Sequence, residues 1–203
     1  MRNILEATGK MHDNSNSIDK IKFLFLLLLL VGCSSVELEE RMQNSCKNRI
    51  ADRVLRKATS EINQKTSLRP IGTAGQMMHE IEMLGLAFNC YEDLTIEEGR
   101  NLLLFCVDAL MKTVNENEEI RHYLKNYPFN EKNIEIRLFL QHPDGSKTQP
   151  GELTVLVALK GKIEYEIRDP ITKRLKIIYE ETYEEAKSQI ANKQIIVMAK
   201  KLI

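Results

Sequence analysis

The chain has 203 residues, and its 29 basic and 29 acidic side chains give a formal net charge of zero. Hydrophobic residues make up 43% and charged residues 29% of it, proportions that are typical of a globular protein with one core. Nucleic-acid binding needs a basic surface for the phosphates, and neither the net charge nor any local block of like charges supplies one. The composition therefore argues against a nucleic-acid partner.

An apolar run, FLFLLLLLVG, occupies residues 23–32 and directly follows Lys20 and Lys22. A membrane-spanning helix needs about 20 apolar residues, whereas the hydrophobic region of a signal peptide needs roughly 7 to 15. A buried strand is an alternative, but consecutive leucines at 26–30 are not the residues that strands favour. Length and flanking charge therefore predict a signal peptide over residues 1–32, rather than an uncleaved anchor or a buried segment.

The apolar run ends in Leu30-Val31-Gly32-Cys33, which resembles the lipobox of bacterial lipoproteins: an aliphatic residue, two small or tolerated residues, then cysteine. The resemblance implies that Cys33 is diacylated, that the peptide is cleaved before it, and that the new amino terminus is acylated again. Several acyl chains on one residue anchor a protein stably, whereas a single chain is marginal. The resemblance thus assigns Cys33 as the lipidation site and makes the membrane a partner through this lipid anchor.

The residues before the apolar run are long for the basic region of a signal peptide, and they include Glu6 and Asp13. A start at Met11 gives a more usual length, so Met11 is the alternative translation start. Ser34 follows the cysteine, where an aspartate is associated with inner-membrane retention in Gram-negative lipoproteins. The resemblance therefore favours the outer membrane over the inner one if the cell is Gram-negative.

Residues 36–127 are predicted to be mainly helical. Apolar residues recur every four positions along 36–66 and predict a first helix; they are Leu38, Met42, Cys46, Ile50, Val54, Ala58 and Ile62. A second helix is predicted from Thr73, where Gln76 completes a capping box, and its apolar face continues to Phe88.

A third helix is predicted from Thr95, with Glu98 as its capping partner. Residues 102–111 are apolar nearly all round, which predicts that this helix is central and the most buried. A short fourth helix is expected over 118–125, before Pro128.

Residues 133–203 are predicted to be rich in strands, because the apolar period changes from 3.6 to 2 after Pro128. The predicted strands cover 134–140, 153–159, 163–167 and 175–179. Short connections favour an antiparallel meander, in which Lys162 would face Glu180 and Glu166 would face Lys176.

Thr182 and Glu185 form a third capping box, which predicts a last helix to about Asn192, and QIIVMA at 194–199 is a candidate fifth strand. Helices followed by strands indicate an α+β fold, with N-terminal helices packed on a C-terminal antiparallel sheet of about four strands. The mature chain, 33–203, is expected to form a single domain. The stretch IRHYLKNYPFNEKNIEIRLF, 120–139, is similar to uncharacterised bacterial envelope proteins, which implies a location but no activity.

Candidate reactive residues are few. Cys46 and Cys106 lie on apolar helix faces and are expected to be buried thiols, whereas Cys90 is the expected exposed one. His79-Glu80 begins a zincin-like motif, but Met83 stands where the second histidine ligand is needed. His122 and His142 are isolated in the sequence, so we predict no metal site and no cofactor.

Asp108 lies inside the predicted central helix, and Lys112 four residues later predicts an ion pair rather than a catalytic carboxylate. No catalytic residues are assigned. The sequence predicts a lipid-anchored envelope protein that is a non-enzymatic binding or structural module with an envelope protein partner. The alternative is an envelope hydrolase that acts on cell wall or lipid. The expected binding surface is the outer sheet face or an edge strand, with apolar Phe139, Leu156 and Ile178 on the side expected to be solvated. The alternative for these three residues is that a helix covers them.

Overall fold

The computed structural model describes the backbone of residues 41–200 and the side chains of residues 41–193. The lipobox-like segment with Cys33, the alternative start at Met11 and the predicted beginning of the first helix lie outside these residues. The chain divides into two units, Met1–Cys46 and Lys47–Ile203. Residues 41–46, the described part of the first unit, are helical, and apart from Cys46 the residues whose structure is discussed below belong to the second unit.

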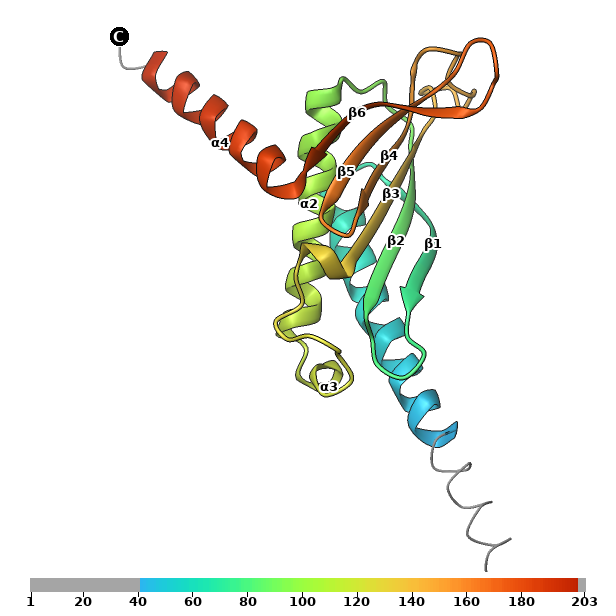
Figure 1. The fold of residues 1–203 in the computed structure, drawn as a ribbon, viewed down its shortest axis with the longest axis vertical. Helices are drawn as coiled ribbons and strands as arrows, with labels where there is room; N and C mark the ends of the chain where they lie inside the picture. The colour runs from blue at the N-terminus through green and yellow to red at the C-terminus, as the bar shows by residue number, and fades with distance from the viewer. Residues whose placement is uncertain (1–40, 201–203) are drawn as a thin grey trace, which may run out of the picture. The chain divides into compact units, whose positions relative to one another are not determined.

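The second unit has an α+β fold built on one six-stranded sheet (Figure 1). Residues 47–65 complete the first helix, and six strands follow in the spatial order β1-β2-β3-β4-β5-β6. Their bounds are β1 Arg69–Gln76, β2 Met83–Cys90, β3 Ile134–Leu140, β4 Leu153–Leu159, β5 Lys162–Arg168 and β6 Leu175–Thr182. Strands β2 and β3 are parallel, and every other neighbouring pair is antiparallel.

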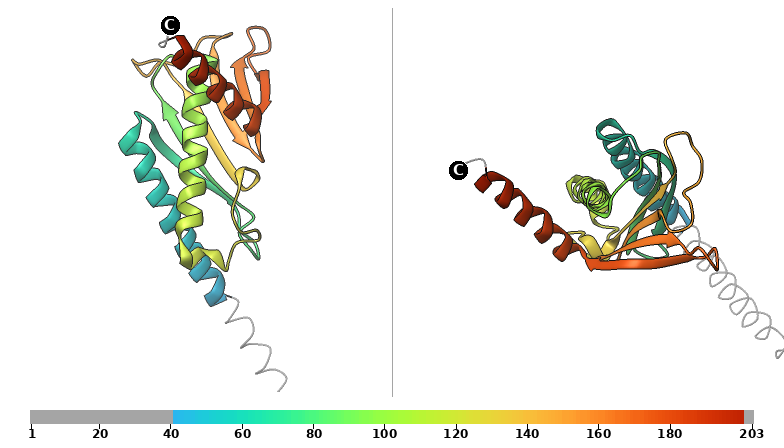
Figure 2. Two further views of the ribbon diagram at one scale, coloured as in Figure 1. Left: turned by 90° about the vertical axis from the view of Figure 1, so that its left-hand side faces the viewer. Right: turned by 90° about the horizontal axis from the view of Figure 1, so that it is seen from above.

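The parallel pair requires a crossover, which α2 (Ile96–Glu116), α3 (Glu118–Arg121) and the 3-10 turn η1 (Glu131–Asn133) provide. After β6 the chain enters α4 (Tyr183–Lys200). The segment 47–65 and α2 lie on the same face of the sheet, as Figure 2 shows. No helix among the described residues is both long and apolar enough to cross a membrane.

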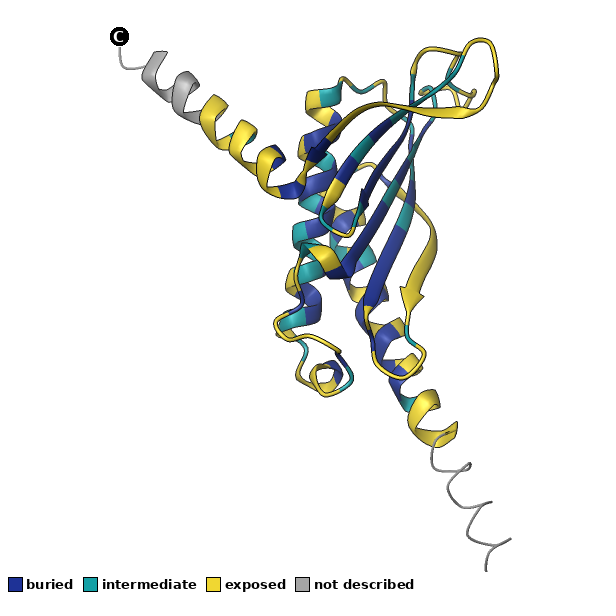
Figure 3. Ribbon diagram, viewed as in Figure 1, coloured by how far each residue is buried: buried dark blue, intermediate teal, exposed yellow. Residues whose placement is uncertain are grey.

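The core lies between this sheet face and the two helices. Strands β2, β3 and β4 are largely buried, whereas the two edge strands, β1 and β6, are almost entirely exposed (Figure 3). Alternate residues of the central strands supply the sheet's part of the core; they are Leu84, Leu86, Phe88, Ile134, Ile136, Leu138, Leu156, Ala158, Ile163 and Tyr165. The first helix contributes Ile50, Val54, Leu55, Ala58 and Ile62 from its apolar stripe.

The helix predicted from Thr73 to Phe88 is wrong, because these residues form β1 and β2, which pair antiparallel. They raise the strand count from the expected four to six and make the sheet mixed rather than purely antiparallel. The strand signal was present as apolar residues at alternate positions from Leu84 to Cys90, separated by small or polar residues. Gly85 is required there, because an added Cβ would lie 2.9 Å from the carbonyl oxygen of Glu135 on β3.

The four predicted C-terminal strands are confirmed, and at Leu156 the structure has the alternative, a covering helix. Leu156 is fully buried against α2, where a Cβ on Gly99 would lie 2.6 Å from Leu156 Cδ1, so it does not face solvent. Alternation defines two faces without saying which is buried, and an irregularity between Leu153 and Val155 also shifts the register. Of the other residues expected on the solvated side, Phe139 is half-buried and Ile178 is exposed.

The predicted beginnings of two helices and one of the two predicted cross-strand pairs are confirmed. Thr95 and Glu98 form the capping box of α2, and Thr182 and Glu185 exchange the same pair of hydrogen bonds before α4. Lys162 Nζ lies 3.0 Å from Glu180 Oε1, as predicted.

Three predicted details differ. Glu166 lies opposite Ile177 instead of Lys176, because β6 contains an extra residue. Helix α3 ends at Arg121, earlier than expected. The QIIVMA segment, 194–199, continues α4 and is not a strand, because the capped helix extends through it.

Candidate functional site

Cys33, the predicted lipidation site, lies outside the described residues, so the described part of the chain offers sites of other kinds. The first is a buried polar network around Glu181 of β6. Glu181 Oε1 accepts hydrogen bonds from Arg100 Nε at 2.6 Å and from the Tyr165 hydroxyl at 2.5 Å. Its Oε2 accepts from Gln189 Nε2 at 2.7 Å and from the Tyr179 hydroxyl at 3.4 Å.

This network joins β5, β6, α2 and α4 through a single carboxylate. Burial, and then the hydrogen bond to Glu181, raise the pKa of Tyr165, so the phenol remains protonated and continues to donate. Both oxygens of Glu181 are occupied by protein donors, and Arg100 balances its charge. The network is therefore suited to holding the edge of the sheet in place, and its carboxylate is already engaged.

The second site is His142, which lies in the loop between β3 and β4 and has a carboxylate near each ring nitrogen. His142 Nδ1 lies 2.8 Å from Asp93 Oδ1, in the loop between β2 and α2. His142 Nε2 lies 3.1 Å from Glu152 Oε2, at the end of the loop between β3 and β4. The hydrogen bond to Asp93 raises the pKa of His142, and the charges of Glu152 and Asp144 raise it further. The His142 ring thus links the two loops.

A cavity of about 310 Å³ adjoins His142 and is lined by Glu92, Asp93, Leu94, Leu140, His142, Thr148, Glu152 and Leu153. A histidine paired with a carboxylate is an arrangement used in general acid–base catalysis. Here Glu152 lies 3.1 Å from the other ring nitrogen, so the ring must release Glu152, and have no proton on that nitrogen, before it can accept one there. The hydroxyls of Thr148 and Thr154 lie 3.0 Å apart and hydrogen-bond to each other.

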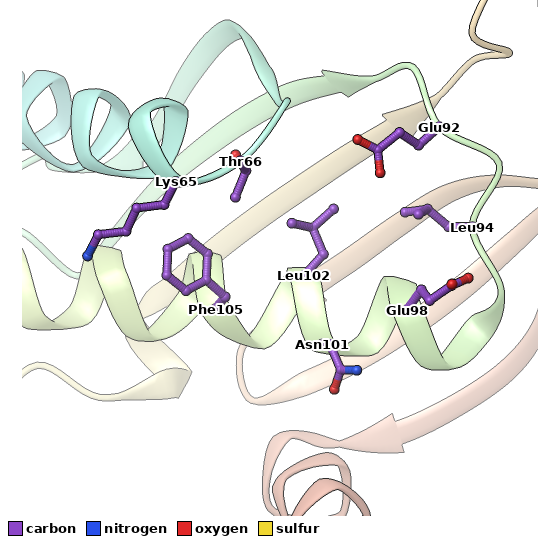
Figure 4. Close-up of a pocket in the computed structure, with 8 residues that line it drawn as sticks. All are labelled: Lys65, Thr66, Glu92, Leu94, Glu98, Asn101, Leu102 and Phe105. Atoms are coloured by element: carbon purple, nitrogen blue, oxygen red, sulfur yellow. The ribbon is translucent and has the colours of Figure 1, made fainter.

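The third site is an open groove of about 410 Å³ beside α2 (Figure 4). Leu102 and Phe105 project from α2 toward Lys65 and Thr66 at the end of the first helix. Lys65 Nζ lies 6.0 Å from the centre of the Phe105 ring. The groove is completed by Glu92, Leu94, Glu98 and Asn101.

The two carboxylates of this groove already have partners. Glu98 caps α2, and Glu92 accepts a hydrogen bond from the Ser67 hydroxyl. The groove therefore offers an apolar floor with few polar groups free to meet a ligand.

The fourth site is the edge strand β6, which pairs with β5 on one side and carries exposed apolar residues. Ile177 and Ile178 are each 46% exposed, and Leu175 and Tyr179 are also exposed. Ile171, in the turn before β6, is 90% exposed. Large apolar side chains gathered on one edge are typical of a surface that contacts another protein.

The structure does not support the predicted exposure of Cys90. Cys90 is buried on β2 rather than exposed, and burial raises the pKa of its thiol and that of Cys106. Cys106 is buried as predicted, Cys46 is only partly buried, and all three are free thiols. The error for Cys90 has the same cause as the missed strands, because a helix end would have left it near solvent.

The predicted ion pair between Asp108 and Lys112 is absent. Asp108 instead accepts a hydrogen bond from the hydroxyl of Tyr183, and Lys112 pairs with Glu116 at 3.8 Å. His79 is exposed, and its carbonyl oxygen accepts a hydrogen bond from the buried Lys47 at 2.9 Å. Among the described residues, no three His, Cys, Asp or Glu side chains are grouped so that they could hold a metal ion.

Sequence reasoning missed Glu181 and the grouping of His142 with Asp93 and Glu152. Glu181 stands between Glu180 and Thr182 in a polar stretch, and its burial depends on strand register. His142 and Asp93 are 49 residues apart. The parallel pairing of β2 with β3 places the loops that follow these strands at the same end of the strands. No family model, curated protein or solved structure matches this chain.

Proposed function

We propose that this chain is a lipid-anchored bacterial envelope protein whose mature domain binds another protein through the β6 edge of its sheet. The anchor rests on the apolar run after Lys20 and Lys22 and on the lipobox-like tetrapeptide that ends at Cys33. The outer membrane is the proposed location in a Gram-negative cell, because Ser34 rather than aspartate follows the cysteine.

The observation that carries the binding function is the exposure of β6. A strand at a sheet edge has unpaired backbone groups, and soluble proteins usually protect such an edge with charges or cover it. On β6, Leu175, Ile177, Ile178 and Tyr179 instead form an exposed apolar stretch that only Lys176 interrupts. Burying this stretch against a partner would remove apolar surface from water, which is the main driving force for association.

Metabolic labelling with a palmitate analogue tests the anchor. We expect the wild-type chain to be labelled and to fractionate with membranes, whereas Cys33→Ser should be unlabelled. Cys46→Ser is the matched control and should be labelled like the wild type, because Cys46 is not preceded by a lipobox-like sequence. Equal labelling of Cys33→Ser and wild type would contradict the assignment of Cys33.

The alternative function is an envelope hydrolase acting on cell wall or lipid, and the cavity beside His142 favours it. The pair His142–Asp93 would supply acid–base chemistry once Glu152 releases the ring. If this function is correct, His142→Gln should abolish hydrolysis of peptidoglycan or of a lipid ester by the full chain. If the protein is a binding module, neither substrate should be turned over by the wild type.

A further inference from the structure

The exposed edge of β6 has opposite charges at its two ends. Lys173 and Arg174 directly precede β6, Lys176 is its second residue, and all three are exposed. At the other end Glu180, Glu184 and Glu185 line a groove of about 480 Å³ together with Tyr179, Glu181, Ser188, Gln189 and Asn192. Ile177, Ile178 and Tyr179 lie between these two ends, and Leu175 lies among the basic residues.

The charges at the two ends are not equally satisfied within the chain. Glu180 pairs with Lys162, and Glu185 accepts hydrogen bonds from Thr182. Lys176 and Glu184 form no salt bridge with any described residue. Lys176 helps to lower the pKa of Asp169 in the preceding turn but makes no direct ion pair with it. One basic and one acidic group without a direct ion-pair partner among the described residues therefore lie toward opposite ends of the same edge.

Such an edge is complementary to itself when reversed. If a second copy lies antiparallel along it, the basic end of each copy meets the acidic groove of the other, and the apolar stretches face each other. A parallel arrangement would bring like charges together, which is unfavourable. A two-fold axis across the edge makes both contacts identical, as in most homodimers.

We propose that the partner of the β6 edge is a second copy of this chain, bound antiparallel, with Lys176 of each copy directed to the acidic groove around Glu184 of the other. This inference rests on the proposed binding function of β6 and is independent of the lipid anchor. The extra residue Ile178 interrupts the ladder between β5 and β6, and such bulges hinder strand addition. The contact is therefore made by side chains and does not need a continuous sheet across the dimer.

Photo-crosslinking in intact envelopes tests the partner. Two copies of the full chain with different epitope tags are produced together, each with Ile178→p-benzoylphenylalanine. We expect an adduct of twice the monomer mass that carries both tags. An adduct with another protein that never carries the second tag would overturn the self-association while leaving the binding function intact. The absence of any adduct would overturn both.

Charge reversal tests the orientation. Lys176→Glu and Glu184→Lys should each lower the doubly tagged adduct about tenfold, because each places like charges together at both ends of the dimer. When the two variants are produced together, the adduct between them should return to the wild-type level, since acid and base again meet at both contacts. This rescue also shows that both variants are folded.

Lys57→Glu is the matched control, because Lys57 is an exposed lysine on the first helix and should leave the adduct unchanged. Adduct yields that do not change when the charge at position 176 or 184 is reversed would overturn the proposed contact. A mixed pair of variants that crosslinks no better than either variant alone would also overturn it.

Discussion

Arg100 on α2 and Glu181 on β6 form a buried ion pair, with 2.6 Å between Nε and Oε1, although 81 residues separate them in the sequence. Strand β6 has little other attachment to the helical layer, because all its residues except Glu181 are exposed. The ion pair and the hydrogen bonds from Tyr165 and Gln189 therefore fix the edge strand and the beginning of α4 to the rest of the domain. The position of the proposed binding edge therefore depends on the polar network around Glu181.

Removing Glu181 should therefore strongly destabilise the domain. Glu181→Ala leaves the Arg100 charge and the Tyr165 hydroxyl buried without their acceptor, a loss that typically costs about 3 to 5 kcal/mol. Glu180→Ala is the control on the neighbouring residue, and it should change the free energy of unfolding little, because its pair with Lys162 is exposed. Urea unfolding followed by circular dichroism measures both, and equal effects would contradict the structural role of Glu181.

The helix α2 is predicted to carry much of the core stability. We expect the chain beginning at Ser34 to unfold cooperatively, and Leu104→Ala to lower its free energy of unfolding by about 2 to 5 kcal/mol, because Leu104 is buried against neighbouring side chains. Lys57→Ala, on the exposed side of the first helix, should stay within about 0.5 kcal/mol of the wild type. Thermal or urea denaturation compares them, and a similar loss for both would refute this view of the core.

The approach of β2 to β3 at Gly85 predicts a steric effect. Gly85→Ala would place a Cβ 2.9 Å from both the Cβ and the carbonyl oxygen of Glu135, so the two strands must separate. We expect a loss of about 1 to 3 kcal/mol, the usual range for overpacking. Gly72→Ala, on the edge strand β1, meets no atom within 4 Å and should not destabilise the protein. Chemical denaturation measures the free energy of unfolding of both variants. A Gly85→Ala variant as stable as the wild type would contradict the close parallel pairing of β2 with β3.

The contacts of His142 with Asp93 and Glu152 predict that the stability they provide depends on pH. Its pKa is raised in the folded protein, mainly by the hydrogen bond to Asp93, above the value of about 6.5 that unfolded histidine has. Its stabilising contribution is therefore fully present below about pH 6.5 and is lost as the pH rises through the folded pKa. NMR titration of the imidazole should show the raised pKa, and Asp93→Asn should bring it down. A His142 pKa that Asp93→Asn leaves unchanged would contradict the contact between His142 and Asp93.

The reactivity of the three described cysteines toward a thiol reagent should follow how deeply each is buried. In the chain beginning at Ser34, a thiol reagent should modify Cys46 in the native state, whereas Cys90 and Cys106 should react only on unfolding, because both are fully buried. Cys46→Ser should therefore remove the native reaction. Rapid modification of Cys90 under native conditions would show that β2 is more accessible than the structure indicates.

Local signals in the sequence were sufficient for elements whose chemistry is contained in a few neighbouring residues. The capping boxes at Thr95 and Thr182 are exchanges of hydrogen bonds over three residues, so they predicted where α2 and α4 begin. The alternation of apolar residues in β3, β4 and β5 likewise predicted these strands. The Thr73–Gln76 pattern has the same form but lies in β1, since pairing with β2 outweighs an isolated cap.

The sequence by itself determined the α+β class, the beginnings of α2 and α4, the four C-terminal strands and the lipobox-like resemblance at Cys33. Only the tertiary structure decided that Leu156 faces α2, that Glu181 is buried with Arg100, and that His142 meets Asp93. These relationships depend on strand order, register and crossover, which join residues tens of positions apart. Local periodicity carries no information about such long-range pairing, because each face or register satisfies the same pattern until the elements pack.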